Sequence, residues 1–304
     1  MKVVFIVDVP GWSLDIFAKR LGPHLDLYST IHYLHLGLDH LHEPPDLNLP
    51  SADVYYCTSW WFLWLLIEAN RLNPKASYVI DVVDAYSWRQ PFFALARRAA
   101  SLVFTLSLDY LQRDPLAVSH PFPTAPAQFT KGCTTQYGWK TRKDTGRLKV
   151  GMITYKGALH SGNDHKGVKI ARQVISELPW CDLEVAGIDH LYSQEEMPAW
   201  YQTKDVFLTL STTEGFSAAL VDALTAGLPI IGTPVSPLHP YLVSPYQYLQ
   251  TTREPADVRQ ALTDVHETLT QGGVLPTAFD VALQWDAARV GPFIGTVLRG
   301  LRRP

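Results

Sequence analysis

Short apolar runs alternate along the chain with longer stretches whose apolar residues recur at helical spacing. In the first half, the apolar runs predict strands over Lys2–Val9, Asp53–Cys57, Tyr78–Val83 and Leu102–Leu106. Between them, helical spacing predicts helices over Trp12–Leu25 and Trp60–Leu72. Strands that alternate with helices in this way are typical of a mostly parallel, doubly wound α/β sheet.

The same alternation starts again after a polar and basic segment. Thr130–Arg147 carries five basic residues against one acid, so we expect the linker there, with a hinge near residue 145. The second half predicts strands up to Thr154, over Leu183–Ala186 and over Val206–Leu210, and helices over Val168–Leu178 and Trp285–Leu301. The sequence therefore predicts an N-terminal domain over 1–145, a C-terminal domain over 146–285 and a terminal helix over 286–304.

The amino-acid composition is that of a globular protein and does not indicate which molecules the protein binds. The 304 residues are 47% hydrophobic and 18% charged with a net charge of −3, so nothing draws the whole chain to polyanions. Cys57, Cys133 and Cys181 form no paired framework, which suits a reducing cytoplasm. The first ten residues predict a strand rather than a secretion signal, and Trp60–Ile67 is too short an apolar run to span a bilayer. We expect a cytoplasmic protein.

The most informative segment is Thr209–Pro234, which reads as strand, turn, helix and strand. Glu214-Gly215 lies at the turn, and helical spacing runs from Phe216 to Ala226. The unpaired N–H groups at such a helix start favour phosphate or polar hydroxyl groups. Asp222 lies eight residues after Glu214, so helical geometry would place both carboxylates on one side, where each can accept from vicinal hydroxyls.

This segment resembles the signature of the retaining GT-B glycosyltransferases of family 4, an acid, seven residues and a second acid. Glu214-Gly215-Phe216, Asp222-Ala223 and Gly227-Leu228-Pro229 carry the resemblance. It implies that Glu214 holds the donor sugar as a catalytic residue and that Asp222 holds the nucleotide ribose. We also expect Gly215, Phe216 and Ser217, around the same turn, to bind the donor. The second acid of the family is Glu, and Asp is shorter by about 1.5 Å, one carbon–carbon bond.

The resemblance also implies an architecture. Members of this family have two Rossmann-like domains that face each other across a cleft, with the acceptor bound by the first domain and the donor by the second. Their terminal helix returns to the first domain, so the helix predicted over 286–304 should pack there.

The resemblance further implies cations at the donor diphosphate. Lys166 matches a lysine-glycine pair that opens the first helix of the donor domain and touches the phosphates, so we count it with the catalytic residues. A companion arginine is missing, and Lys156 or His160 is the nearest substitute. Gly11 matches the small residue that lets backbone approach the phosphate, with an ordinary turn as the alternative.

Three further positions complete the predicted site. Gly187 follows the strand where the family holds its nucleotide base, and we expect base contacts near Tyr192. Asp84 stands where relatives often carry a histidine, so it either orients the acceptor hydroxyl as a catalytic residue or caps a turn.

The predicted function is retaining transfer of a sugar, of hexosyltransferase type, from a UDP- or GDP-sugar to an acceptor hydroxyl. The sequence shows no Asp-x-Asp pair, so we expect no metal and no cofactor besides the nucleotide-sugar substrate. The acceptor stays open between a glycan or small molecule, a lipid-linked molecule touching Trp60–Ile67, and modified DNA touching the basic segment up to Lys149.

Three rival functions stay open at the level of sequence. With DNA as the acceptor, the protein would be a phage-type enzyme acting on a hydroxymethylated base. A non-catalytic nucleotide-sugar-binding protein would keep the fold without the reaction. A nucleotide-sugar epimerase would share the two-domain architecture but needs its own acid and base pair.

Overall fold

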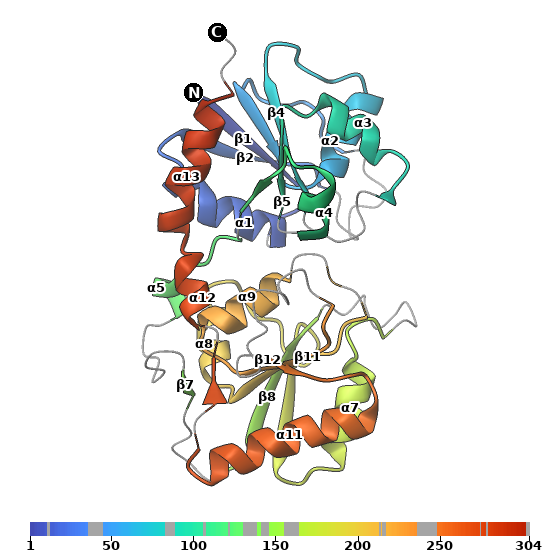
Figure 1. Cartoon of the computed structure of the whole chain (residues 1–304), viewed down its shortest axis with the longest axis vertical. Coiled ribbons are helices and arrows are strands. Elements are labelled where there is room, and N and C mark those ends of the chain that lie inside the picture. The colour runs from blue at the N-terminus through green and yellow to red at the C-terminus, as the bar shows by residue number, and fades with distance from the viewer. Residues whose placement is uncertain are drawn as a thin grey trace. The chain divides into compact units, whose positions relative to one another are not determined.

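The computed structural model describes residues 1–10, 13–35, 45–82, 89–105, 108–120, 122–129, 139–140, 146–154, 164–212, 214, 217–235, 248–273, 275–277 and 279–301. The chain divides into two compact units, the first made of Met1–Pro123 and Trp285–Pro304 and the second of Thr124–Gln284. Each unit contains its own parallel sheet (Figure 1).

The first unit is built on a sheet with the strand order β2-β1-β3-β4-β5-β6, in which every neighbouring pair is parallel. Its strands are β1 (Lys2–Val7), β2 (Tyr28–Tyr33), β3 (Val54–Cys57), β4 (Ser77–Val82), β5 (Leu102–Thr105) and β6 (Val118–Ser119). The four strands that the apolar runs predicted are β1, β3, β4 and β5. The edge strand β2 was not predicted, because it mixes polar and apolar residues and is only partly buried.

The helices of the first unit end where the local sequence stops them. They are α1 (Ser13–Leu21), the 3₁₀ turn η1 (Gly22–His24), α2 (Trp60–Glu68), α3 (Phe93–Ala99), α4 (Leu108–Arg113) and α13 (Ala287–Arg299). The first helix stops before the predicted Leu25, because Gly22-Pro23 cannot continue an α-helix and forms η1 instead. The second stops at Glu68, because Asn70 is left-handed and the Arg71 N–H bonds back to the Leu66 carbonyl at 2.9 Å.

The aromatic run of α2 contributes mainly to the core of the first unit. Trp60, Phe62, Leu63 and Leu66 are buried, and Trp61 packs partly buried against the same cluster. This favours the core interpretation of that run over a surface contact. In the described ranges, each helix is too short or too polar to cross a lipid bilayer.

The second unit is built on a parallel sheet with the strand order β12-β11-β10-β8-β9. Its strands are β8 (Leu148–Ile153), β9 (Cys181–Ala186), β10 (Val206–Thr209), β11 (Ile230–Gly232) and β12 (Tyr248–Gln250). Its helices are α5 (Pro126–Phe129), α7 (Val168–Ser176), α8 (Met197–Gln202), α9 (Ala218–Thr225), α11 (Pro255–Thr270) and α12 (Phe279–Gln284). A small antiparallel pair joins β7 (Trp139–Lys140) to β13 (Leu275–Pro276).

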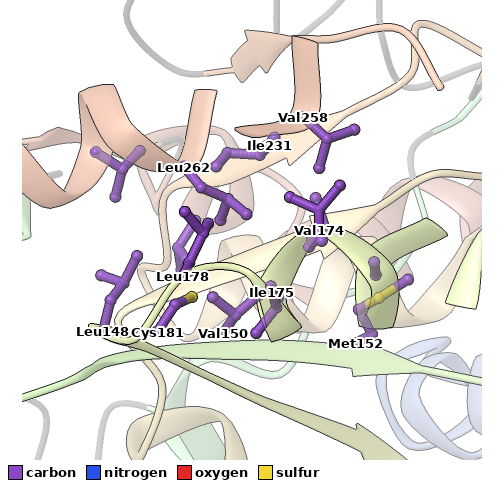
Figure 2. Close-up of a cluster of buried hydrophobic side chains, with 14 of the residues drawn as sticks. Leu148, Val150, Met152, Val174, Ile175, Leu178, Cys181, Ile231, Val258 and Leu262 are labelled. Carbon is purple, nitrogen blue, oxygen red and sulfur yellow. The ribbon is translucent and has the colours of Figure 1, made fainter. Parts of the chain in front are cut away.

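One hydrophobic core of the second unit lies between its sheet and the helices α7 and α11. Figure 2 shows Val174 of α7 and Val258 and Leu262 of α11 packed over Val150 and Ile231 of the strands. Both helices carry their apolar residues at helical spacing, which gives each one a single buried stripe. This packing fixes the loops that precede α7 and α11 at the carboxyl end of the sheet.

The break between the units falls at residue 123, whereas the polar composition of Thr130–Arg147 predicted a hinge near 145. The segment after the break packs into the second unit, because the Phe129 ring lies 5.8 Å from the Tyr201 ring and Gln202 donates to the Phe129 carbonyl at 2.8 Å. Thr124 Oγ1 also donates to the Ala282 carbonyl at 2.7 Å. A polar composition marks a linker poorly when a few apolar residues anchor the segment.

The terminal helix α13 belongs to the first unit, where it packs against η1 and α1. Gly295 makes this packing possible, because a Cβ there would overlap the Leu25 carbonyl oxygen. The prediction of an α/β fold with two doubly wound, mostly parallel sheets is confirmed.

Candidate active site

The candidate site lies at the carboxyl ends of β8 and β10 in the second unit. From β8 the chain moves outward to β9, and then returns past β8 to form β10 on its other side. The strand order therefore reverses between β8 and β10. In open parallel sheets such a reversal point leaves a crevice outside the strand ends, and ligands bind there.

Glu214 lies in the loop that follows β10 and is held by two hydrogen bonds. Its Oε1 accepts from Lys166 Nζ at 2.5 Å and from Ser211 Oγ at 2.5 Å. The Glu214 side chain is 9% exposed and that of Lys166 is 27% exposed. Thr233 in turn donates through Oγ1 to the Ser211 carbonyl at 2.7 Å, which ties the loop to the end of β11. The carboxylate is therefore oriented before any ligand arrives.

Lys166 reaches Glu214 because the loop before α7 lies directly against the end of β10. Gly167 has φ +74°, and a Cβ there would overlap Leu210 Cβ and lie 2.8 Å from the Leu210 carbonyl oxygen. Only glycine permits this approach at this backbone angle. The lysine-glycine pair thus places the ammonium group at the reversal point of the sheet.

The ion pair joins the two residues that the family resemblance assigns to phosphate and sugar. They are 48 positions apart in the chain, and the fold brings them into contact. The site holds one positive and one negative group side by side, both partly shielded from water. Such a pair can exchange its internal contact for a ligand that offers an anion to the lysine and hydroxyl donors to the carboxylate.

Ser217 and Asp222 belong to α9, which starts two residues later than expected. Ser217 is the N-cap, and its Oγ accepts from the Leu220 N–H at 3.3 Å. Asp222 lies in the second turn and is 7% exposed. Because Glu214 lies in the loop before the helix, a full helical repeat does not relate the two acids, and that argument from spacing is wrong. The N-terminal end of α9 still opens at the carboxyl end of β10.

Gly187 and Tyr192 lie after the edge strand β9, next to β8. Gly187 has φ +87°, and its N–H donates to the His190 carbonyl at 2.7 Å in a tight turn. Tyr192 donates its hydroxyl to Glu184 Oε1 at 2.5 Å, and the hydrogen bond to this carboxylate raises the Tyr192 pKa to about 12. Its ring lies 4.4 Å from the His190 ring. The phenol therefore stays protonated at neutral pH and offers its ring rather than a charge.

The remaining predicted site residues lie outside the described ranges. These are Gly11, Asp84, Lys156, Gly215 and Phe216, together with the alternative His160. Across the part of the chain that the structure describes, no group of three or more His, Cys, Asp or Glu side chains could hold a metal ion. The expectation of a metal-independent site stays a prediction.

A surface groove of about 710 Å³ lies away from this site, along the edge strand β9. Its lining includes Arg147, paired with Asp182 at 2.9 Å, and Arg172, paired with Asp189 at 2.5 Å. Neither Lys166 nor Glu214 lines it. The positive charge of these two arginines is already offset by their acids.

The residues that support the ion pair were not predicted from the sequence. Ser211 and Thr233 hold Glu214, while Thr212 and Arg253 hold the loop that carries Lys166. Each of them stands just after a strand of the second unit, and that position is the one signal the sequence offers. Serine, threonine and arginine are too frequent after strands for this signal to select them.

Part of the second unit matches a known protein family. Residues 186–268 match the family model described as "Glycosyl transferases group 1". The match includes Gly187, Tyr192, Glu214, Ser217 and Asp222 and excludes Lys166. No curated protein sequence matches the chain.

Solved structures match over nearly the whole chain. Sucrose-phosphate synthase from Thermosynechococcus elongatus aligns with a TM-score of 0.72 at 11% identity, covering 99% of this chain and 98% of its own. HepE from Anabaena in complex with UDP aligns with a TM-score of 0.72 at 16% sequence identity, covering 99% of this chain and 100% of its own. The HepE complex with UDP-glucose aligns with a TM-score of 0.71 at 15% identity and the same coverage of both chains. These likenesses confirm the predicted GT-B fold class.

Proposed function

We propose that this protein is a glycosyltransferase that moves a sugar from a nucleotide diphosphate donor to an acceptor hydroxyl, with retention of configuration and without a metal ion. The observation that carries the proposal is the Lys166–Glu214 pair at the reversal point of the second sheet. The family match of residues 186–268 and the fold shared with HepE, whose structures contain UDP and UDP-glucose, support it.

Donor binding would open the ion pair and use both partners. The ammonium of Lys166 would turn to the diphosphate oxygens, whose charge it offsets in a partly water-excluded site. Glu214, still oriented by Ser211, would then accept hydrogen bonds from two hydroxyls of the sugar. The pair therefore selects for a ligand that carries both an anion and vicinal hydroxyls.

The nucleotide would extend from the diphosphate toward the end of β9. The ring of Tyr192 would face the base beside Gly187, and Asp222 in α9 would accept from the ribose hydroxyls. Gly11 and Lys156 would add phosphate contacts, and Gly215, Phe216 and Ser217 would add further contacts to the donor. Asp84 would orient the acceptor.

The chemical step needs no covalent intermediate with the protein. The bond between the anomeric carbon and the phosphate oxygen breaks, and the acceptor oxygen bonds to that carbon on the same face. The acceptor proton moves to the leaving phosphate oxygen, so a nucleoside diphosphate and the glycoside are the products. The protein contributes placement and charge stabilisation, which together account for large rate accelerations.

The test begins with a screen of nucleotide sugars by thermal shift, since a ligand that binds the native state raises Tm. With the donor identified, we expect Glu214→Gln to lower nucleoside diphosphate release at least ~100-fold while Tm changes by only a few degrees. Glu267→Gln, on the exposed face of α11, is the matched control and should keep full activity. Near-normal release by Glu214→Gln would refute the assigned role.

Two further measurements address the finer parts of the proposal. The anomeric configuration of the product by NMR distinguishes retention from inversion. Activity that persists in a strong chelator supports metal independence, and activity restored only by added Mg²⁺ or Mn²⁺ contradicts it.

A further inference from the structure

We infer that Arg253 is a positioning residue for the donor diphosphate: it holds the loop 164–167 in place and so fixes where Lys166 meets the phosphates. The inference rests on the proposed function of Lys166. Arg253 follows β12 and precedes α11. It lies far from Lys166 in the sequence and is neither of the two acids of the family signature.

The guanidinium of Arg253 binds the loop through its main chain. Nη2 donates to the Asp164 carbonyl at 2.5 Å, and Nη1 lies 3.5 Å from the His165 carbonyl oxygen. Nη2 also lies 3.8 Å from Asp164 Oδ2, and the Arg253 side chain is 24% exposed. Arginine suits this task, because its planar group presents several fixed donors at once.

Thr212, in the loop after β10, also holds the loop 164–167. The Thr212 N–H donates to the His165 carbonyl at 3.0 Å, and Thr212 Oγ1 lies 2.7 Å from His165 Nδ1. The His165 carbonyl is therefore reached from the loop after β10 and from the loop after β12. Lys166, the next residue, has little freedom to move its backbone.

The loop is also tied to the helix that follows it. The carboxylate of Asp164 accepts from the Lys169 N–H at 3.1 Å, and the Asp164 carbonyl accepts from the Gly167 N–H at 3.0 Å. Arg253 adds its bond to this same carbonyl. Losing Arg253 would loosen one residue that anchors both the turn and the start of α7.

Arg253 is itself held firmly enough to act as a support. The Thr251 N–H donates to the Gly232 carbonyl at 3.0 Å, which continues the pairing of β11 and β12. The Glu254 N–H donates to Thr252 Oγ1 at 3.0 Å, and Thr252 Oγ1 in turn bonds the Asp257 carboxylate. The loop 251–254 is thus tied to the sheet and to the first turn of α11, and the Arg253 side chain reaches the loop 164–167.

Preorganisation explains why this support matters for binding. A lysine side chain gains affinity for phosphate when its backbone is already in place, because less freedom is lost when the ligand binds. Arg253 should therefore act on donor affinity through Lys166, without touching the reacting atoms.

The test uses the full chain with Arg253→Met and Arg253→Lys, and two readouts. Hydrogen exchange of the ligand-free protein should be faster at residues 164–170 in Arg253→Met, and calorimetry should give a Kd for UDP, or for GDP or ADP if the wild type prefers it, weaker by about tenfold. Arg253→Lys should recover part of the exchange protection and part of the affinity for the nucleotide, because its ammonium can still donate to the Asp164 carbonyl. Arg259→Met on α11, which removes the ion pair with Glu177, is the control and should change neither.

The outcomes separate the two proposals. A wild type that binds UDP while Arg253→Met binds it equally well overturns the positioning role and leaves the proposed function intact. A wild type that binds none of UDP, GDP and ADP overturns the proposed function and this inference with it. Equal loss of affinity in Arg253→Met and Arg259→Met also counts against the inference, since it would reflect a general effect on α11.

Discussion

At the scale of single residues, two ion pairs among the described residues differ in how their acid is bound. Asp114 in the first unit is fully engaged: it accepts from Arg97 Nε at 2.6 Å, from the Tyr110 hydroxyl at 3.0 Å and from the Leu116 N–H at 3.2 Å. Glu214 in the second unit takes both of its described bonds on one oxygen. The first arrangement stabilises the fold, and the second can be rearranged by a ligand.

The Arg97–Asp114 pair should make stability depend on acidity. The hydrogen bond from Arg97 lowers the Asp114 pKa below its unfolded value of 3.8, so the pair stabilises the fold above about pH 4 and loses this effect as pH falls further. We expect Asp114→Asn to lower the free energy of unfolding by about 2 kcal/mol at pH 7. Urea unfolding of both proteins between pH 7 and pH 3 measures the difference.

The control for this experiment is Asp264→Asn on α11, whose carboxylate accepts only from Gln260 at 2.8 Å among the described contacts. It should change the unfolding free energy by less than about 0.5 kcal/mol. A difference between wild type and Asp114→Asn that stays constant down to pH 3 would contradict the assignment.

At the scale of elements, the junction between β10 and α7 decides whether the site forms. Leu210, just after the strand, lies against Gly167 at the start of the helix, and the neighbouring Lys166 bonds Glu214. The core between the sheet and α7 and α11 holds both elements in place (Figure 2). The site is therefore as rigid as the packing beneath it.

Gly167→Ala tests this junction against a matched glycine. Gly272 has the same φ of +74°, but a Cβ there would meet nothing within 4 Å. Gly272→Ala should therefore lower the free energy of unfolding only by the strain of a left-handed alanine backbone, about 1 kcal/mol. Gly167→Ala adds a clash with Leu210 to the same backbone strain, so it should lower the free energy of unfolding by about 3 kcal/mol. Chemical denaturation measures both, and equal losses in the two variants would mean that the contact with Leu210 is unimportant.

At the scale of the whole molecule, each unit contains a cluster of buried apolar side chains. Leu63 lies in the core of the first unit and Leu262 in that of the second, and both are fully buried. Local stability in such a chain follows the core to which a residue belongs.

Truncation of these leucines should show the division. We expect Leu63→Ala and Leu262→Ala each to lower the free energy of unfolding by about 2–5 kcal/mol. Hydrogen exchange should rise within 1–123 and 285–301 for Leu63→Ala and within 124–284 for Leu262→Ala. Equal acceleration in both units for either variant would show that the chain unfolds as one cooperative body.

Much of the architecture could be predicted from local pattern. Strands buried on both faces need continuous apolar runs, and helices over a sheet need one apolar stripe, so β1, β3, β4, β5, β8 and β10 and the helix α7 were visible in the sequence. The edge strand β2 lacked such a run. The start of α9 was placed too early, because helical spacing in Phe216–Ala226 does not reveal that Ser217 caps the helix.

For the candidate site too, some features follow from the local sequence and others only from the tertiary structure. The sequence by itself determined the acid, the lysine-glycine pair and the turn in which each occurs, because these depend on residue type and on neighbours in the chain. Only the tertiary structure decided that Lys166 reaches Glu214, that Arg253 reaches Asp164 across 89 positions, and that the segment after Pro123 joins the second unit. Such contacts depend on strand order and on the packing of distant elements, and no local pattern of residues encodes them.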